Sequence, residues 1–134
     1  SGYYDQFSDL FYNTDPAIVA DDLYEFCKQY LVYKEEGVKR QTSALPTGII
    51  YRGYITREGV DCKHYAIFNA GVIGSLNRLY NCRFEAKYLF VGYEGAKEPY
   101  HVYVAVRDRE NEIWLDPTPG GGGTPTLIVA KSVG

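Results

Sequence analysis

The amino-acid sequence predicts an α+β fold, and three observations support that class. Residues 15–30 and 61–79 place apolar side chains at helical spacing, whereas the segments after residue 82 alternate with a period of two. An irregular segment separates the two helical patterns, and the alternating segments follow one another along the chain. Helices grouped first and strands grouped afterwards indicate an antiparallel sheet packed against helices.

The first helical pattern begins at Asp15-Pro16, because aspartate is a favoured N-cap and proline fits the first turn. Gly37 is its predicted stop. Cys27 falls on the apolar face, so we interpret it as a small core residue. Residues 1–14 show no clear period and are predicted to pack as an arm or a short helix. The apolar face is formed by Val19, Leu23, Phe26, Cys27 and Tyr30.

The second helical pattern runs from Asp61 to about Leu79 and is apolar on two neighbouring sides, which predicts a central helix. Gly71 and Gly74 each cost a helix about 1 kcal/mol, so they indicate close packing against another backbone. Between the two helices the chain looks irregular, apart from a short strand predicted over residues 49–51.

Period-two alternation predicts an antiparallel meander in the last part of the chain. The polar residues 108–111 form its central turn, and a symmetric turn there pairs Arg107 with Glu112 and Val104 with Leu115. The glycines at 120–123 form a flexible stretch before the last strand. The predicted strands cover residues 83–91, 100–107, 112–115 and 127–130.

Length, charge and hydropathy exclude several classes of protein. The 134-residue chain carries 14 basic and 17 acidic residues, a net charge of −3, without a basic stripe, which argues against a nucleic-acid partner. No apolar run approaches the roughly 18 residues of a membrane span, so no membrane partner is expected. The length fits one domain, residues 1–134, with a core that needs no disulfides. Ser1-Gly2 looks like a tag scar on a domain excised from a longer protein, where other domains adjoin it; the cellular compartment stays open.

Among the three cysteines, Cys62 has a distinctive place. An odd number of cysteines in a chain this short argues against a disulfide framework. Cys62 opens the central helix, where the helix dipole and free backbone N–H groups favour thiolate over thiol. Its own N–H is placed to donate to an oxyanion. The alternative is a small buried residue that happens to lie near a helix start.

A nucleophilic thiol needs a base, and the chain has two histidines. His64 follows Cys62 by two helical positions, so the two side chains point apart, and we interpret His64 as a surface residue. His101 opens a strand, and the predicted hairpin register places it one diagonal step from Asp116 on the same face. A carboxylate in that position orients the imidazole and stabilises its charged form. The sequence therefore predicts a site made of Cys62, His101 and Asp116.

Three segments carry a resemblance to a known family: GVDCKHYA around Cys62, HVYVAV from His101, and IWLDPT with Asp116 near its end. In order and context they resemble the transglutaminase-like superfamily of papain-fold enzymes, over residues 59–118. The resemblance implies a papain-like fold in which the helix that carries Cys62 packs on an antiparallel sheet. It also implies Cys62 as nucleophile, His101 as general base and acid, and Asp116 as the orienting group. No cofactor is implied, and no carboxylate-rich loop matches the calcium sites of large animal transglutaminases.

These observations predict a thiol-dependent hydrolase or acyl transferase that acts on amide bonds of a peptide or protein substrate. Gln41 and Tyr51 are the candidates considered for a second oxyanion donor. Two alternatives stay open. One is a catalytically inactive interaction domain of a larger protein. The other is a zinc site, since Cys62, His64, Cys82 and His101 are suitable ligand types, although the paired short spacings of structural zinc sites are missing.

Overall fold

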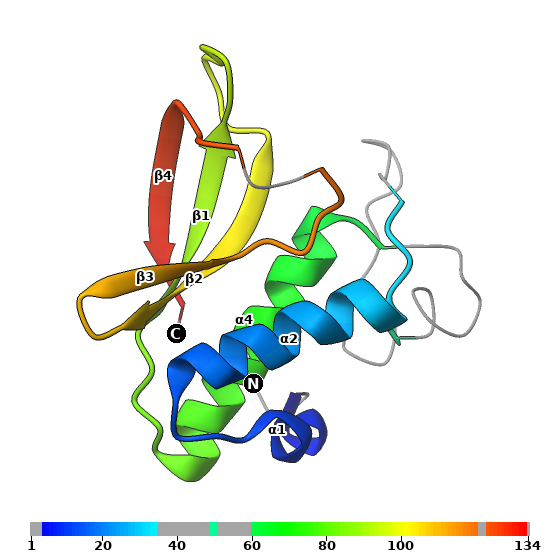
Figure 1. The fold of residues 1–134 in the computed structure, drawn as a ribbon, viewed down its shortest axis with the longest axis vertical. Coiled ribbons are helices and arrows are strands. Elements are labelled where there is room, and N and C mark those ends of the chain that lie inside the picture. The colour runs from blue at the N-terminus through cyan, green and yellow to red at the C-terminus, as the bar shows by residue number, and fades with distance from the viewer. Residues whose placement is uncertain (1–3, 35–48, 51–59, 121–122, 134) are drawn as a thin grey trace.

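A computed structural model describes residues 4–34, 49–50, 60–120 and 123–133. The described residues have the α+β architecture that the sequence predicts, with three helices described over their full length and one four-stranded antiparallel sheet (Figure 1). The strand order across the sheet is β3-β2-β1-β4. None of the described helices is long and apolar enough to cross a membrane. The elements are α1 (Asp5–Phe11), α2 (Pro16–Tyr30), α4 (Cys62–Tyr80), β1 (Ala86–Gly92), β2 (His101–Asp108), β3 (Asn111–Leu115) and β4 (Leu127–Ser132).

The helix α2 begins as predicted but ends early. The Asp15 carboxylate accepts a hydrogen bond of 2.9 Å from Ala17 N and so caps the first turn. The helix ends at Tyr30, because the backbone adopts an extended conformation at Leu31. Gly37, the predicted stop, lies outside the described residues. The N-terminal segment forms a real helix, α1, which packs against α4 and α2.

The helix α4 is central, as its two apolar sides predict, and Phe68 in its middle is fully buried. Gly71 is needed for close packing, since a Cβ added there would lie 2.5 Å from the ring of Tyr4. The neighbour is therefore an aromatic ring rather than the backbone that we expected. For Gly74 the expectation is wrong, because a Cβ there would meet nothing within 4 Å.

The hairpin between β2 and β3 has the predicted register, whereas β1 begins later than predicted. Strand pairing starts at Ala86 rather than at residue 83. Arg83 has a positive φ of 60°, a left-handed conformation that does not fit a strand. The side-chain amide of Asn77 forms hydrogen bonds with both backbone polar groups of Phe84. It accepts from the N–H at 2.7 Å and donates to the carbonyl oxygen at 2.9 Å. A helix side chain therefore replaces a strand partner at this point.

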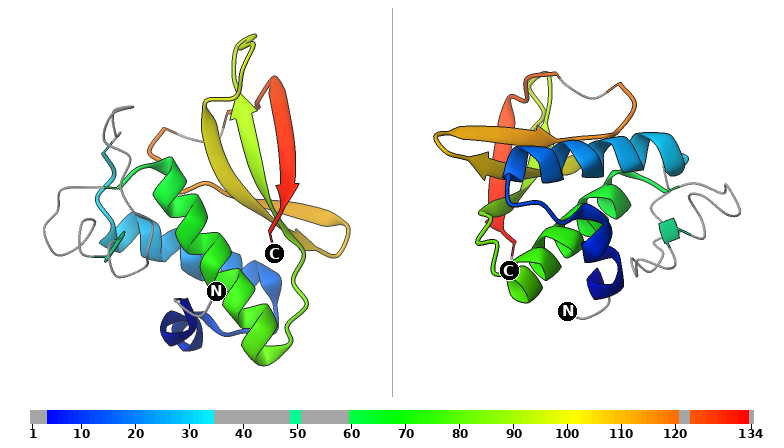
Figure 2. Two further views of the ribbon diagram at one scale, coloured as in Figure 1. Left: turned by 180° about the vertical axis from the view of Figure 1, so that it is seen from behind. Right: turned by 60° about the horizontal axis from the view of Figure 1, so that its bottom comes forward.

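The core lies between one face of the sheet and the helices (Figure 2). Cys27 is completely buried in it, which confirms its interpretation as a core residue. Ile49 and Ile50 are helical, so the strand predicted over residues 49–51 is wrong for these two, and Tyr51 lies outside the described residues. The fully buried core side chains include Leu23, Cys27, Phe68, Val72, Leu76, Val104 and Val106.

Candidate active site

The thiol of Cys62 sits where the sequence places it, on the first residue of α4. The first backbone N–H groups of a helix have no acceptor within it, and the helix dipole adds positive potential there. Cys62 is partly exposed and lines a groove described below. In Figure 1 the N-terminus of α4 points toward the region where the chain leaves β3.

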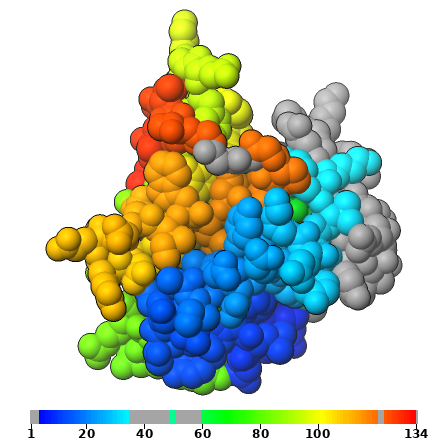
Figure 3. Space-filling view, in the orientation of Figure 1, coloured from blue at the N-terminus to red at the C-terminus, as the bar shows by residue number. Residues whose placement is uncertain are grey.

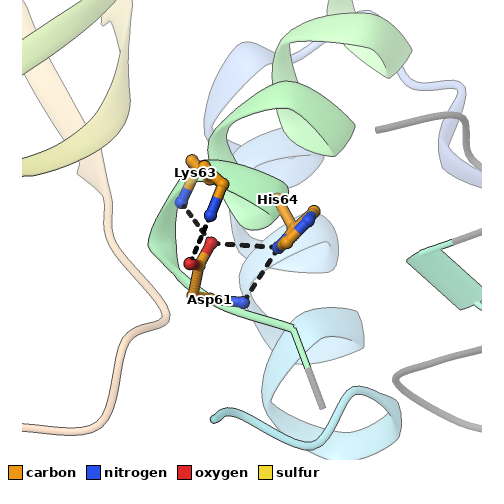
Figure 4. Close-up of polar contacts among 3 residues, drawn as sticks. All are labelled: Asp61, Lys63 and His64. Atoms are coloured by element: carbon orange, nitrogen blue, oxygen red, sulfur yellow. Dashed lines mark hydrogen bonds and ion pairs between the residues drawn. The ribbon is translucent and has the colours of Figure 1, made fainter. Parts of the chain in front are cut away.

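The cap of α4 is a cluster of three side chains, shown in Figure 4. The Asp61 carboxylate accepts from Lys63 N at 3.2 Å and forms an ion pair of 2.6 Å with Lys63 Nζ. His64 Nδ1 lies 3.1 Å from Asp61 N, which donates to it, and so closes a capping box. Burial alone would raise the pKa of Asp61, but its polar contacts with His64 and Lys63 hold it well below its usual range. The cap thus fixes the backbone from which the Cys62 side chain projects.

The interpretation of His64 as a surface residue is wrong, since its side chain is only 1% exposed. The spacing of two residues from Cys62 determines only how the His64 side chain lies relative to the thiol. The third residue of a helix also faces back toward the N-cap, and there the imidazole takes the place of the usual Glu or Gln of a capping box. The sequence signal was Asp-x-x-His at a helix start.

His101 and Asp116 meet in the way that the hairpin register predicts. Val104 pairs with Leu115 and Arg107 with Glu112, so the ladder continued by one step places Asp116 beside the start of β2. His101 Nε2 lies 2.9 Å from Asp116 Oδ2. The two side chains are 12% and 9% exposed, so the pair is largely shielded from water.

The imidazole of His101 is also close enough to Cys62 to interact with its sulfur. Because Nε2 faces Asp116, Nδ1 is the nitrogen left for the thiol. Burial lowers the pKa of His101, but the hydrogen bond to Asp116, the nearby thiol of Cys62 and the charges of both groups outweigh it and raise the pKa to about 9. An imidazole of that basicity holds a proton at neutral pH and can stabilise a neighbouring thiolate.

A groove of about 1070 Å³ contains both Cys62 and His101. One wall is the start of α4, with Asp61, Cys62 and Lys63. The opposite side is formed by the sheet and by the loops on either side of it. Its described lining residues from these parts include Phe90, Tyr93, Pro99, Tyr100, Val102, Thr118, Pro119, Thr126 and Val129. A substrate of peptide size therefore has room beside the thiol.

The other two thiols differ from Cys62 in their surroundings. Cys27 is fully buried, and burial raises its pKa to about 12 even though a hydrogen bond to Asn69 lowers it. Burial also raises the pKa of Cys82. Neither cysteine is among the described residues that line the groove.

Some residues around Asp116 were not singled out from the sequence. Thr118 N donates to Asp116 Oδ1 at 3.3 Å, so the carboxylate is held on both oxygens. The hydroxyls of Tyr103 and Thr118 are buried and have no hydrogen-bond partner among the described residues, beside a cavity of about 250 Å³ that Asp116 also lines. Figure 3 shows the segment after β3, in orange, lying next to α2 at the surface. The run IWLDPT contained the signal for the bond to Thr118 N, since an aspartate side chain in a turn often accepts from the backbone N–H two residues later.

The zinc alternative is not supported, because the described residues contain no group of three His, Cys, Asp or Glu side chains arranged to hold a metal ion. Cys62, His64, Cys82 and His101 are all described, and His64 is committed to the helix cap. The oxyanion candidates Gln41 and Tyr51 lie outside the described residues.

Comparison with known proteins does not assign the chain to a family. A scan against protein-family models, a search of curated proteins and a search of solved structures each give no match.

Proposed function

We propose that this protein is a thiol-dependent hydrolase or acyl transferase with a papain-like, transglutaminase-like fold, acting on amide bonds of a peptide or protein. One observation carries the proposal. A partly exposed thiol at a helix N-terminus shares a groove with an imidazole whose far nitrogen is hydrogen-bonded to a carboxylate at 2.9 Å. Nucleophile, base and orienting group are thus arranged in the order that thiol catalysis needs.

The architecture supports the fold assignment as well. The helix that carries Cys62 packs against β2 and β1 of an antiparallel sheet, the arrangement that a papain-like fold requires. His101 opens β2, and Asp116 directly follows the adjacent strand, β3.

In the proposed reaction the Cys62 thiolate attacks the amide carbonyl carbon and forms a C–S bond, and the carbonyl electrons move to oxygen. The N–H of Cys62 lies at the start of α4, where it can donate to this oxyanion. His101 then gives its proton to the amide nitrogen, the C–N bond breaks, and an amine leaves. A thioester remains on Cys62.

A second nucleophile resolves the thioester. His101, now neutral, takes a proton from water or from an amine as it attacks the carbonyl, and the C–S bond breaks to release the thiolate. Water gives a carboxylic acid, and an amine gives a new amide. Hydrolysis is the expected default, because the thiol is accessible and water is abundant unless a site excludes it.

The test is the pH dependence of alkylation of each cysteine by iodoacetamide, measured by mass spectrometry. We expect Cys62 to react far faster than Cys27 and Cys82 below pH 7 in the folded protein. His101→Ala should abolish this advantage, since it removes the cation that stabilises the thiolate. The two other cysteines are internal controls in every spectrum. A Cys62 that titrates like a free thiol, or a rate unaffected by His101→Ala, would contradict the proposal.

A non-catalytic interaction domain is the second candidate, and one observation favours it. Tyr100, on the rim of the groove, is 66% exposed, and Tyr93 packs edge-on against it at 6.0 Å. Exposed aromatic side chains of this kind are typical of binding surfaces. This candidate predicts an ordinary thiol at Cys62, so the alkylation experiment separates the two functions.

A further inference from the structure

Three apolar side chains form a continuous row on the floor of the groove, which we call the apolar shelf (Val102, Phe90 and Val129). Phe90 of β1 pairs with Val102 of β2 on one side and with Val129 of β4 on the other. Residues paired across strands point to the same face, so the three side chains lie side by side. All three line the groove that contains Cys62.

Among the described residues, the shelf is less buried than the valines that follow Val102 on the same face of β2, although Val102 itself packs against the edge of the core. On the same strand and face as Val102, Val104 and Val106 are buried under the helices, at 0% and 1% exposure. Val102 and Phe90 are only partly buried, and Val129 is 51% exposed. Seen from behind, α4 lies beside the sheet, and the upper ends of β2, β1 and β4 extend above it (Figure 2, left). Single exposed apolar residues are common, but a paired row inside a groove with a thiol suggests a binding surface.

We propose that the apolar shelf binds an apolar side chain of an extended peptide whose amide carbonyl lies at Cys62, and so selects the substrate. This inference rests on the proposed function. Thiol and shelf share one groove, so a molecule that presents its carbonyl to Cys62 must place its remainder in that groove. A peptide is the occupant that supplies both an amide and side chains at regular spacing.

The dimensions of the shelf fit this occupant. Neighbouring strands lie about 4.8 Å apart, so a row across three strands spans roughly 10 Å. An extended peptide covers that length with about three residues, at about 3.3 Å per residue. The charges near the thiol do not favour a charged side chain on the shelf, because Asp61 and Lys63 pair with each other at 2.6 Å.

The experiment uses iodoacetyl tripeptide amides that carry one Phe, moved along an otherwise all-Ser sequence, with the all-Ser peptide as reference. We expect one Phe position to accelerate alkylation of Cys62 by about tenfold over the all-Ser peptide, a typical discrimination by an apolar subsite. Glutathione, alkylated by the same peptides, should show no such preference. Dividing each peptide's alkylation rate by the iodoacetamide rate of the same protein corrects for differences in the intrinsic reactivity of the thiol.

Variants of β4 locate the effect on the shelf. Val129→Lys should remove most of the preference for Phe, and the nearly isosteric Val129→Thr should weaken it without a change in size. Ile128→Lys is the matched control, because Ile128 is the adjacent residue, is 47% exposed, and pairs with Val91 on the opposite face. It should leave the preference unchanged.

The outcomes separate this inference from the proposed function. Equal relative rates for all peptides, or a preference that survives Val129→Lys, would overturn the shelf proposal even if Cys62 is activated by His101. A Cys62 that iodoacetamide labels but no peptide reaches would overturn it too. A strong Phe preference at a thiol of ordinary reactivity would support the shelf while the catalytic proposal falls.

Discussion

His101 Nε2 lies 2.9 Å from Asp116 Oδ2, across 15 residues of sequence that form one hairpin. The contact joins the first residue of β2 to the residue that follows β3. The other carboxylate oxygen accepts from Thr118 N, so the carboxylate is fixed before any substrate arrives. Because main-chain pairing holds His101 and Asp116 in this way, the imidazole needs no rearrangement to be oriented.

Asp116→Asn should bring the pKa of His101 down from about 9 toward its ordinary value of about 6.5. The asparagine keeps the shape but loses the charge that stabilises the imidazolium. Alkylation of Cys62 below pH 7 should slow on the order of 10-fold, in line with such a change in pKa. Proton NMR of the imidazole, assigned with His101→Ala, measures the pKa directly.

Glu112→Gln is the matched control for this variant. It removes a carboxylate from β3, the strand that Asp116 follows, and this carboxylate pairs with Lys87 at 2.8 Å rather than with His101. The pKa of His101 should not move in it. A His101 titration that is the same in wild type and Asp116→Asn would contradict the assigned role of Asp116.

His101 should make the stability of the fold depend on pH in the neutral to alkaline range. The imidazole has a pKa of about 9 when folded and about 6.5 when unfolded, so folding takes up a proton between these values. Its stabilising contribution is complete below about pH 6.5 and is lost as the pH rises through about 9. The contribution should be at most about 3 kcal/mol in the free energy of unfolding.

Urea denaturation of wild type and His101→Gln between pH 5.5 and pH 10 checks this prediction. The difference between the two proteins should be largest at the acidic end. Asp61 affects stability in a different pH range. Because its pKa is lowered in the folded protein, its contribution to the free energy of unfolding is lost only as the pH falls below about 4. A difference that is constant with pH would show that His101 stabilises the fold by packing alone.

His64→Ala should destabilise the protein by roughly 1–2 kcal/mol, because it removes the acceptor of the Asp61 N–H and leaves that buried group unpaired. The start of α4 should loosen, so the enhanced alkylation of Cys62 should also decline. His64→Gln should restore much of both, since Gln is a usual third residue of a capping box. Unfolding curves and Cys62 alkylation rates give the two readouts. Equal loss in both variants would argue against the capping role.

The two glycines of α4 should respond to alanine in opposite directions. Gly71→Ala should destabilise the fold by roughly 1–2 kcal/mol, because the new methyl group would lie 2.5 Å from the Tyr4 ring and push it out of its packing. Gly74→Ala should stabilise it by up to about 1 kcal/mol, since the space there is open and alanine is the better helix former. Thermal unfolding of the two variants measures both. A stabilising Gly71→Ala would mean that Tyr4 moves aside at little cost.

The sequence by itself determined those features that depend on neighbours along the chain. The helix that carries Cys62 begins where Asp61 caps it, and that cap is a local interaction. The register that brings His101 to Asp116 followed from the length of one tight turn. In both cases the decisive contacts lie within a helical turn or a single hairpin.

Tertiary structure decided the features that depend on distant segments. Three such features are the burial of His64, the free space at Gly74 and the late start of β1. They depend on contacts between separate elements or on local backbone conformations, and residue patterns specify neither. The approach of Cys62 to His101 is of the same kind, because it requires α4 to pack across β2 at one particular height. Periodicity specifies which face of an element is apolar, but the side chains of both partners determine where along that face the two elements settle.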